Sequence, residues 1–223
     1  MGRTALVLGA TGLVGGELVN RLERKENYSQ ITLIGRRPFS IGSKKVRNVV
    51  VNMHSLKDVA EEFKVDDIFC CLGTTIKKAG SKEAFRQVDF QLPVAAAQLG
   101  SFEGAKNFLV ISSMGANTNS AFFYNRVKGE MEEEVKKMTF DAIHIFRPSL
   151  LLGSRKEFRL GEKLAEWAVK PFSKILPDSL KKSFPIPAET VANAMAIAAQ
   201  MEAQGINIYE SGQIRETGKS IFK

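Results

Sequence analysis

The fold is decided by one stretch near the start of the chain, Thr4-Ala5-Leu6-Val7-Leu8-Gly9-Ala10-Thr11-Gly12-Leu13-Val14-Gly15. Its apolar run predicts a buried strand, and the G-x-x-G-x-x-G pattern that follows predicts a tight turn into a helix. Gly9 opens this turn, Gly12 lets the backbone approach a pyrophosphate, and Gly15 lets the helix pack closely on the strand. The helix N-terminus offers free N–H groups to phosphates. The stretch therefore favours dinucleotide binding over an ordinary glycine-rich turn.

Strand-like and helix-like segments alternate from this stretch to Phe146. Continuous apolar runs predict strands at residues 4–8, 31–34, 46–51, 67–72, 107–112 and 141–146. Apolar residues at helical spacing predict helices at residues 13–24, 57–63, 82–99 and 124–138. Strands that are apolar throughout and separated by helices predict an α/β fold. We expect a doubly wound, mainly parallel, Rossmann-like sheet with helices on both faces.

We expect one domain over residues 1–223. The part after Arg147 predicts a helix at about 160–175, a helix at 188–201 and a short strand at 206–209. We expect residues 148–223 to form a small cap on the substrate side, which is short for a large substrate domain.

Composition and charge exclude several classes of protein. The chain has 223 residues, 44% of them hydrophobic, and a net charge of +8 from 32 Lys+Arg against 24 Asp+Glu. No apolar stretch reaches 18 residues, and the adjacent Cys70 and Cys71 suit neither a disulfide framework nor a zinc site. Half of the surplus charge lies between Arg155 and Lys182, where the aromatic residues have amphipathic-helix spacing. We expect a soluble cytoplasmic protein, a monomer or homodimer, with no metal, nucleic-acid or membrane partner.

The end of the second predicted strand favours NADP(H) over NAD. A site that prefers NAD usually places Asp or Glu there, where it accepts a hydrogen bond from the ribose 2′-OH. This chain has Leu33-Ile34-Gly35-Arg36-Arg37-Pro38 instead. The forked guanidinium groups of Arg36 and Arg37 suit a 2′-phosphate, and the alternative is a pair of solvated loop arginines. After the third strand, Asn52 is expected to contact the adenine.

Tyr124 and Lys128 form a Tyr-x-x-x-Lys pattern in a predicted helix. Four residues make just over one turn, so both side chains project from the same face. A neighbouring ammonium stabilises a phenolate, so Tyr124 is predicted to act as general acid toward a carbonyl or as general base toward an alcohol. The fifth strand ends in Ser112 and Ser113, either of which can hydrogen-bond the same substrate oxygen. The pattern alone is also compatible with a chance surface pair.

Together these motifs resemble the short-chain dehydrogenase/reductase superfamily in its extended or atypical form. The closer similarity is to the branch that contains the Tat-interacting tumour-suppressor oxidoreductase. It rests on Ile31-Thr32-Leu33-Ile34-Gly35-Arg36-Arg37, on Cys70-Cys71-Leu72-Gly73-Thr74-Thr75 and on Val127-Lys128-Gly129-Glu130. Phe146-Arg147-Pro148 and Leu176-Pro177-Asp178-Ser179 extend it over nearly the whole chain. The Cys-Cys-Leu-Gly-Thr-Thr run is much more specific than any glycine pattern.

The resemblance implies an NADPH-binding Rossmann-like fold and assigns residue roles. The pyrophosphate would contact Thr11, Gly12, Leu13 and Val14, and the 2′-phosphate would contact Arg36 and Arg37. Leu72 and Gly73 would line the cofactor site, and Leu151 and Arg159 would lie near the nicotinamide. Tyr124 would be the proton donor, with Lys128 as its partner. Two positions depart from the family: Thr11 replaces a serine, and Asn52 stands where many relatives carry Asp.

Three functions follow as hypotheses. The first is an NADP(H)-dependent oxidoreductase that transfers a hydride to or from a small carbonyl or alcohol. The second is an NADPH-binding regulatory or scaffold protein with a protein partner and little or no turnover. The third is a nucleotide-sugar epimerase or dehydratase, which uses the same motif but usually has a larger C-terminal region.

Overall fold

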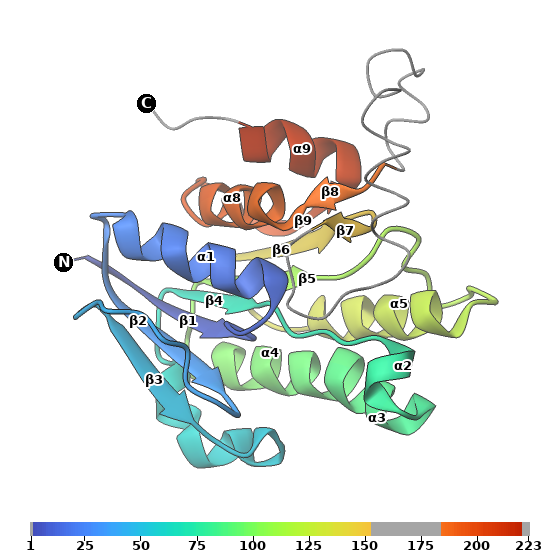
Figure 1. The fold of residues 1–223 in the computed structure, drawn as a ribbon, viewed down its shortest axis with the longest axis horizontal. Helices are drawn as coiled ribbons and strands as arrows, with labels where there is room; N and C mark the ends of the chain where they lie inside the picture. Colours follow the sequence, from blue (N-terminus) through green and yellow to red (C-terminus); the bar gives the residue numbers. More distant parts are fainter. Residues whose placement is uncertain (1, 153–183, 220–223) are drawn as a thin grey trace.

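A seven-stranded parallel sheet forms the centre of the computed structural model, which describes residues 2–152 and 184–219 (Figure 1). Its strands are β1 (Arg3–Leu8), β2 (Tyr28–Gly35), β3 (Val46–Val50), β4 (Asp67–Cys70), β5 (Asn107–Ile111), β6 (Ala142–Arg147) and β9 (Gly205–Glu210). They lie in the order β3-β2-β1-β4-β5-β6-β9, and every neighbouring pair is parallel. The predicted doubly wound Rossmann-like fold is confirmed.

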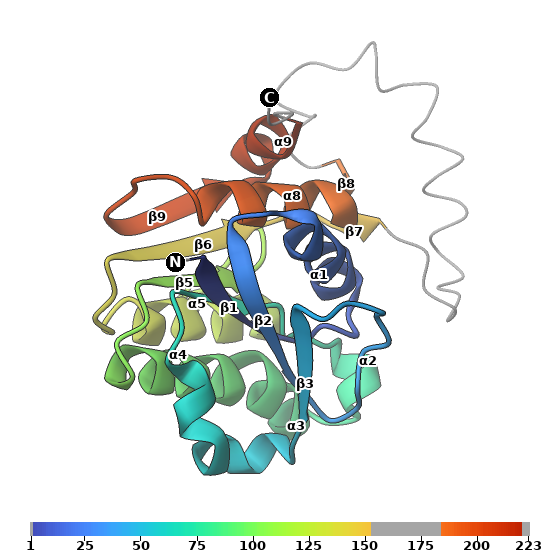
Figure 2. The same cartoon turned by 90° about the vertical axis from the view of Figure 1, so that its left-hand side faces the viewer.

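Helices cover both faces of this sheet (Figures 1 and 2). One face carries α1 (Leu13–Arg24) and α8 (Ala188–Ala198), with α9 (Ser211–Lys219) packed against α8. The other face carries α4 (Leu92–Phe102), α5 (Phe123–Val135) and the 3₁₀ segment η1 (Met53–Phe63). The strands between them are therefore covered on both sides, as their continuous apolar sequences predict.

Two apolar cores result from the alternation of side chains along the strands. In β1, Ala5 and Val7 pack on the side of α1 and α8, whereas Leu6 and Leu8 pack on the side of α4 and α5. This alternation holds β1 between the two helical layers. It also fixes the position of the glycine turn that follows Leu8.

The predicted helix at 82–99 is divided into three parts. The structure has α3 (Lys82–Arg86), a π-helical segment η2 (Gln87–Gln91) and α4, and a short helix α2 (Ile76–Ala79) precedes them. Pro93 is the second residue of α4. Proline has no N–H to donate to a carbonyl four residues earlier, so a continuous α-helix is disfavoured at this point. The change of helix type turns Asp89 into the protein, where it is buried.

Residues 184–219 complete the main sheet and add a second, short pairing. The predicted helix at 188–201 and strand at 206–209 correspond to α8 and β9, and β9 pairs with β6 as the last strand of the large sheet. The two-residue strands β7 (Leu151–Leu152) and β8 (Ile186–Pro187) pair with each other. The predicted helix at 160–175 lies outside the described residues.

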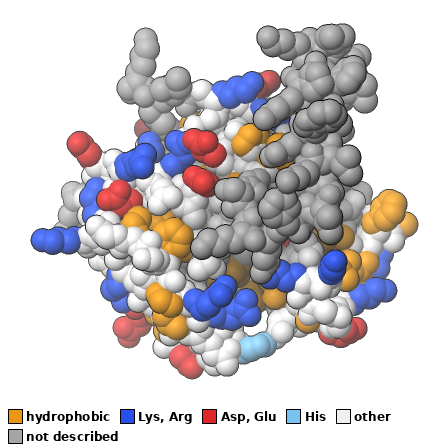
Figure 3. All heavy atoms as spheres, in the orientation of Figure 1, with side chains coloured by type: hydrophobic (Ala, Val, Ile, Leu, Met, Phe, Trp, Pro, Cys, Tyr) orange, Lys and Arg blue, Asp and Glu red, His pale blue; other side chains and the backbone are white. Residues whose placement is uncertain are grey.

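The described surface is mixed in charge. Side chains of both signs are interspersed over the face shown in Figure 3, among the residues that are not grey. None of the helices in the described part of the chain is long and apolar enough to cross a membrane.

Candidate cofactor and catalytic site

The candidate site lies at the carboxyl ends of the central strands. Strand order reverses between β1 and β4, because β2 and β3 lie on one side of β1 while β4 and the later strands lie on the other. In open parallel sheets, ligands bind in the crevice at such a reversal. Two adjoining cavities occupy this edge, and they share Gly12, Leu13, Cys71, Leu72, Gly73 and Thr74. The site is therefore one continuous groove with an outer and an inner part.

The turn between β1 and α1 requires its glycines. Gly9 has a φ of +86°, and a Cβ there would lie 2.6 Å from the carbonyl oxygen of Cys71. A Cβ on Gly15 would lie 2.2 Å from the carbonyl oxygen of Gly9, so only glycine permits this close packing. Gly12 precedes the first residue of α1, and the first turn of the helix carries no acidic residue. This helix end therefore offers free N–H groups to the groove, at the place where the sequence predicts that a pyrophosphate binds.

The outer part of the groove is a cavity of about 1070 Å³ beside the ends of β2 and β3. Gly9, Thr11, Arg36, Arg37 and Asn52 all line it. Arg36 and Arg37 are exposed, and no acidic residue directly follows β2. Asn52 also caps η1, because its side-chain oxygen accepts a hydrogen bond from the backbone N–H of His54 at 3.1 Å. Arg36, Arg37 and Asn52, which were predicted for the adenine end, thus line the same cavity.

The inner part of the groove is a cavity of about 430 Å³ between the ends of β4 and β5 and helix α5. The predicted catalytic residues Ser112, Ser113, Tyr124 and Lys128 all line it, together with Val14, Leu72, Gly73 and Leu151. Residues far apart in the sequence are therefore brought together, as predicted. Arg159 lies outside the described residues.

Tyr124 and Lys128 lie one turn apart on α5. Tyr124 is half-buried, and its ring packs against that of Phe85 with centroids 5.4 Å apart. Lys128 is buried, and its Nζ donates to the backbone carbonyl of Ile111 at 3.3 Å. The lysine therefore links α5 to the end of β5, directly before the two serines.

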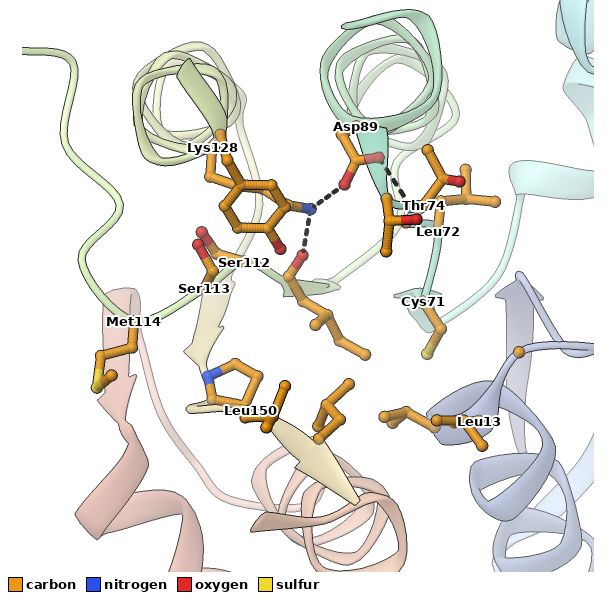
Figure 4. Close-up of a pocket in the computed structure, with 18 of the residues that line it drawn as sticks. Leu13, Cys71, Leu72, Thr74, Asp89, Ser112, Ser113, Met114, Lys128 and Leu150 are labelled. Atoms are coloured by element: carbon orange, nitrogen blue, oxygen red, sulfur yellow. Dashed lines mark hydrogen bonds and ion pairs between the residues drawn. The ribbon is translucent and has the colours of Figure 1, made fainter. Parts of the chain in front are cut away.

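Sequence reasoning missed the closest partner of Lys128. Its Nζ lies 2.9 Å from Oδ1 of Asp89, and both side chains are almost fully buried (Figure 4). Burial alone would lower the pKa of Lys128. The Asp89 carboxylate raises this pKa, and Tyr124 raises it to a smaller extent, so that the pKa lies above its ordinary value. The lysine therefore remains an ammonium ion at neutral pH. No spacing rule in the sequence marks Asp89, because it sits within an apparently ordinary amphipathic helix.

Ser112 and Ser113 carry the clearest sign of an interaction that the protein leaves open. Both residues are buried, and neither hydroxyl oxygen has a hydrogen-bond partner among the described residues. Buried hydroxyl groups are normally paired, since desolvating them without a partner costs about 1–3 kcal/mol. Both side chains lie beside Lys128 at the inner cavity (Figure 4). They therefore fit a ligand oxygen at this position.

Among the described residues, an apolar wall of the inner cavity is formed by Leu13, Met114, Pro148, Leu150 and Leu151, which sequence reasoning named only in part. The polar backbone atoms here are largely used: the Met114 N–H donates to the Pro148 carbonyl, and the Ile186 N–H donates to the Leu150 carbonyl. The inner cavity thus presents both hydroxyl groups and hydrocarbon side chains.

Comparison with known proteins agrees with this arrangement. A family model described as NAD(P)H-binding matches residues 9–166, which include the glycine turn, Asp89, both serines, Tyr124 and Lys128. This chain belongs to that NAD(P)H-binding family.

Particular relatives place it more narrowly. The chain is 38% identical over 197 residues to Protein HTATIP2 of Rattus norvegicus, covering 86% of this chain and 79% of the relative. It is 36% identical over 169 residues to Protein FMP52, mitochondrial, of Candida albicans, covering 73% of this chain and 74% of the relative. The predicted similarity to the branch of the Tat-interacting oxidoreductase is confirmed.

Solved structures share the fold. The ADP-L-glycero-D-manno-heptose-6-epimerase of Helicobacter pylori superposes with a TM-score of 0.70 at 16% identity, covering 97% of this chain and 80% of that one. MoeE5 in complex with UDP-glucose and NAD gives a TM-score of 0.69 at 14% identity, covering 92% and 74%. These likenesses establish the Rossmann-type architecture.

Proposed function

We propose that this chain is an NADP(H)-dependent oxidoreductase that interconverts a small carbonyl compound and its alcohol. One observation carries the proposal: two buried serine hydroxyls, unpaired within residues 2–152 and 184–219, open onto the same cavity as Tyr124 and Lys128, at the inner end of the dinucleotide groove. A protein that only binds the dinucleotide has no need of unpaired hydroxyls beyond it.

The chain's own residues would divide the work along the groove. The backbone of the glycine turn would hold the pyrophosphate, and Arg36 and Arg37 would hold the 2′-phosphate, which favours NADP(H) over NAD. When bound, the nicotinamide supplies or accepts the hydride.

At the inner end, the protein would supply the proton and orient the substrate. Ser112 or Ser113 would donate a hydrogen bond to the substrate carbonyl oxygen, and the Tyr124 hydroxyl would donate its proton to that oxygen as it becomes an alcohol. The Lys128 ammonium would stabilise the resulting phenolate. In the reverse direction, the phenolate would take the proton from the alcohol.

The apolar wall supports an uncharged substrate. Met114, Leu150 and Leu151 would face the substituents of the carbonyl, and a charged group placed against them would be desolvated without a partner. We therefore propose an aldehyde or ketone with hydrocarbon substituents. The likeness to nucleotide-sugar enzymes extends to the fold alone.

The test is consumption of NADPH with a panel of aliphatic and aromatic aldehydes and ketones, by the wild type and by Tyr124→Phe. General acid catalysis contributes about 10²- to 10⁴-fold, so Tyr124→Phe should lose at least 100-fold in kcat while NADPH affinity is kept. The control Tyr209→Phe removes a hydroxyl from β9, away from the groove, and should turn over normally. Full activity of Tyr124→Phe would refute the assigned role.

The second candidate is an NADPH-binding regulatory protein with a protein partner, because the names of both sequence relatives state no reaction. It predicts NADPH binding without turnover, and cellular effects that survive Tyr124→Phe. We propose a cytoplasmic location. The name of the Candida albicans relative states a mitochondrial one, and cell fractionation distinguishes the two.

A further inference from the structure

Ser112 and Ser113 both reach the inner cavity, although they are neighbours in the chain. Successive side chains of a strand point to opposite faces of the sheet, so two neighbours within a strand do not share one cavity. Strand β5 ends at Ile111, however, and both serines line the inner cavity beyond it. Figure 4 shows both side chains on one side of this cavity, beside Lys128. The cavity therefore offers a pair of hydroxyl groups.

The other buried polar side chains that line this cavity in the described part of the chain are already paired. Asp89 and Lys128 form an ion pair with each other. The hydroxyl of Ser149, which also lines the cavity, donates a hydrogen bond to the backbone carbonyl of Phe184. Within residues 2–152 and 184–219, the two adjacent serines are thus the buried groups that the protein leaves for a ligand.

One carbonyl oxygen does not use both serine hydroxyls in the proposed reaction. A carbonyl oxygen has two lone pairs. The Tyr124 hydroxyl would donate to one of them, and one serine hydroxyl would donate to the other. A ketone with a single oxygen would leave the second serine hydroxyl buried without a partner, which proteins normally avoid. The second hydroxyl therefore fits a second oxygen on the substrate.

We propose that the substrate carries a second, uncharged oxygen on the carbon next to the reacting carbonyl, as in a 1,2-diketone. This inference rests on the proposed function and narrows it. The two oxygens belong on neighbouring carbons because the two serines are neighbours, with Cα atoms about 3.8 Å apart. The apolar wall that includes Met114 and Leu150 would face the hydrocarbon beyond them.

The reaction itself is unchanged by the second oxygen. One carbonyl carbon of the diketone would accept the hydride from NADPH, and its oxygen would accept the proton from Tyr124. The product would be an α-hydroxy ketone, whose second oxygen keeps its carbonyl bond. The remaining serine would hold that second oxygen throughout and would take no part in proton transfer.

The test compares 1-phenyl-1,2-propanedione with the two monoketones that each lack one of its oxygens, 1-phenyl-1-propanone and 1-phenyl-2-propanone. Diketones are intrinsically more electrophilic, so the informative quantity is the change in preference between wild type and the variants Ser112→Ala and Ser113→Ala. We expect one variant to lose kcat/KM for all three ketones, because it no longer binds the reacting oxygen. The other should lose roughly 10- to 100-fold for the diketone alone.

The stability of the ligand-free protein gives an independent readout. A buried hydroxyl without a partner costs free energy, so each serine-to-alanine variant should keep or raise the midpoint of thermal unfolding. A clear fall would show that the hydroxyl is paired within the protein, and would overturn the inference. Ser29→Ala is the matched control, because its exposed hydroxyl donates to the Gly2 carbonyl at 3.1 Å near the start of β2. It should change neither preference nor stability appreciably.

The outcomes separate this inference from the proposed function. If wild type reduces neither the diketone nor any other aldehyde or ketone, the proposed function fails and the inference fails with it. If wild type reduces ketones but neither serine variant changes the preference for the diketone, only the second oxygen is refuted. A variant that weakens NADPH binding at unchanged preference refutes it as well, because that hydroxyl would then bind the dinucleotide.

Discussion

At the scale of single residues, we propose that Arg36 and Arg37 decide the choice of cofactor. They follow β2 directly, are exposed and line the outer cavity. A hydrogen bond to a charged group contributes about 1.5–3 kcal/mol. Replacing both by alanine should weaken NADPH binding by roughly 10- to 100-fold or more on that scale, while NADH binding changes little. Calorimetric titration with both dinucleotides measures the ratio.

Arg24→Ala is the matched control for this prediction. Arg24 is an exposed arginine at the other end of α1, far along the helix from the glycine turn. It should leave the affinity for both dinucleotides unchanged. Equal losses of NADPH and NADH binding in the Arg36→Ala/Arg37→Ala variant would show that the arginines do not read the 2′-phosphate.

Neighbouring glycines in α1 give a test at the scale of the element. A Cβ on Gly15 would meet the Gly9 carbonyl oxygen at 2.2 Å, whereas a Cβ on Gly16 would lie 3.4 Å from the Ala10 carbonyl oxygen, an ordinary contact. Gly15→Ala must push α1 away from the turn. Overpacking of this kind typically costs about 1–3 kcal/mol, so we expect the unfolding free energy to fall by about 3 kcal/mol. Dinucleotide binding should be lost with it.

Gly16→Ala should instead be neutral or stabilising. Alanine in a helix interior is favoured over glycine by about 0.8–1.0 kcal/mol. Chemical denaturation of both variants measures the difference. Equal destabilisation by the two substitutions would contradict the close approach of α1 to the turn.

The elements differ in how far the sequence predicts them. The strands and α1 could be predicted because continuous apolar runs and a glycine turn are local signals, and all six strands predicted before Arg147 are present. The division of the helix at 82–99 could not, because it depends on how Pro93 and the π-helical segment fit between the sheet and α5. Asp89 was missed for the same reason, since its burial follows from that segment. Met114 and Leu150 were missed because apolar loop residues carry no motif.

The acid stability of the whole molecule should depend on His144. This residue is buried in β6, and its Nδ1 lies 3.0 Å from the hydroxyl of Tyr209 on β9. Burial lowers the pKa of His144 to about 4 from an ordinary value of 6.5. The neutral ring therefore stabilises the fold above pH 6.5, and this contribution is lost as pH falls toward 4.

The expected loss is about 3 kcal/mol in unfolding free energy between pH 7 and pH 4, from the difference of the folded and unfolded pKa values. His144→Phe packs on the same neighbours without a titrating ring, so its stability should fall less steeply with acid. Denaturation of both proteins at several pH values gives the difference in slope. Parallel curves would show that the burial of His144 does not govern acid unfolding.

The arrangement of the whole molecule places the residues proposed for binding and for chemistry in one groove. The reversal of strand order opens the crevice. The residues that follow β1, β2, β4 and β5 line it, from Arg37 in the outer cavity to Tyr124 in the inner cavity. We propose above all that this groove holds NADPH in preference to NADH.

A thermal-unfolding titration of the pure protein with each dinucleotide tests that claim most directly. A ligand at 100 times its dissociation constant stabilises the folded state by about 2.7 kcal/mol, which gives a clear shift of the unfolding midpoint. We expect this shift with NADPH and little with NADH at the same concentration. A shift with NADH alone would contradict the role of the two arginines, and no shift with either would contradict the account as a whole.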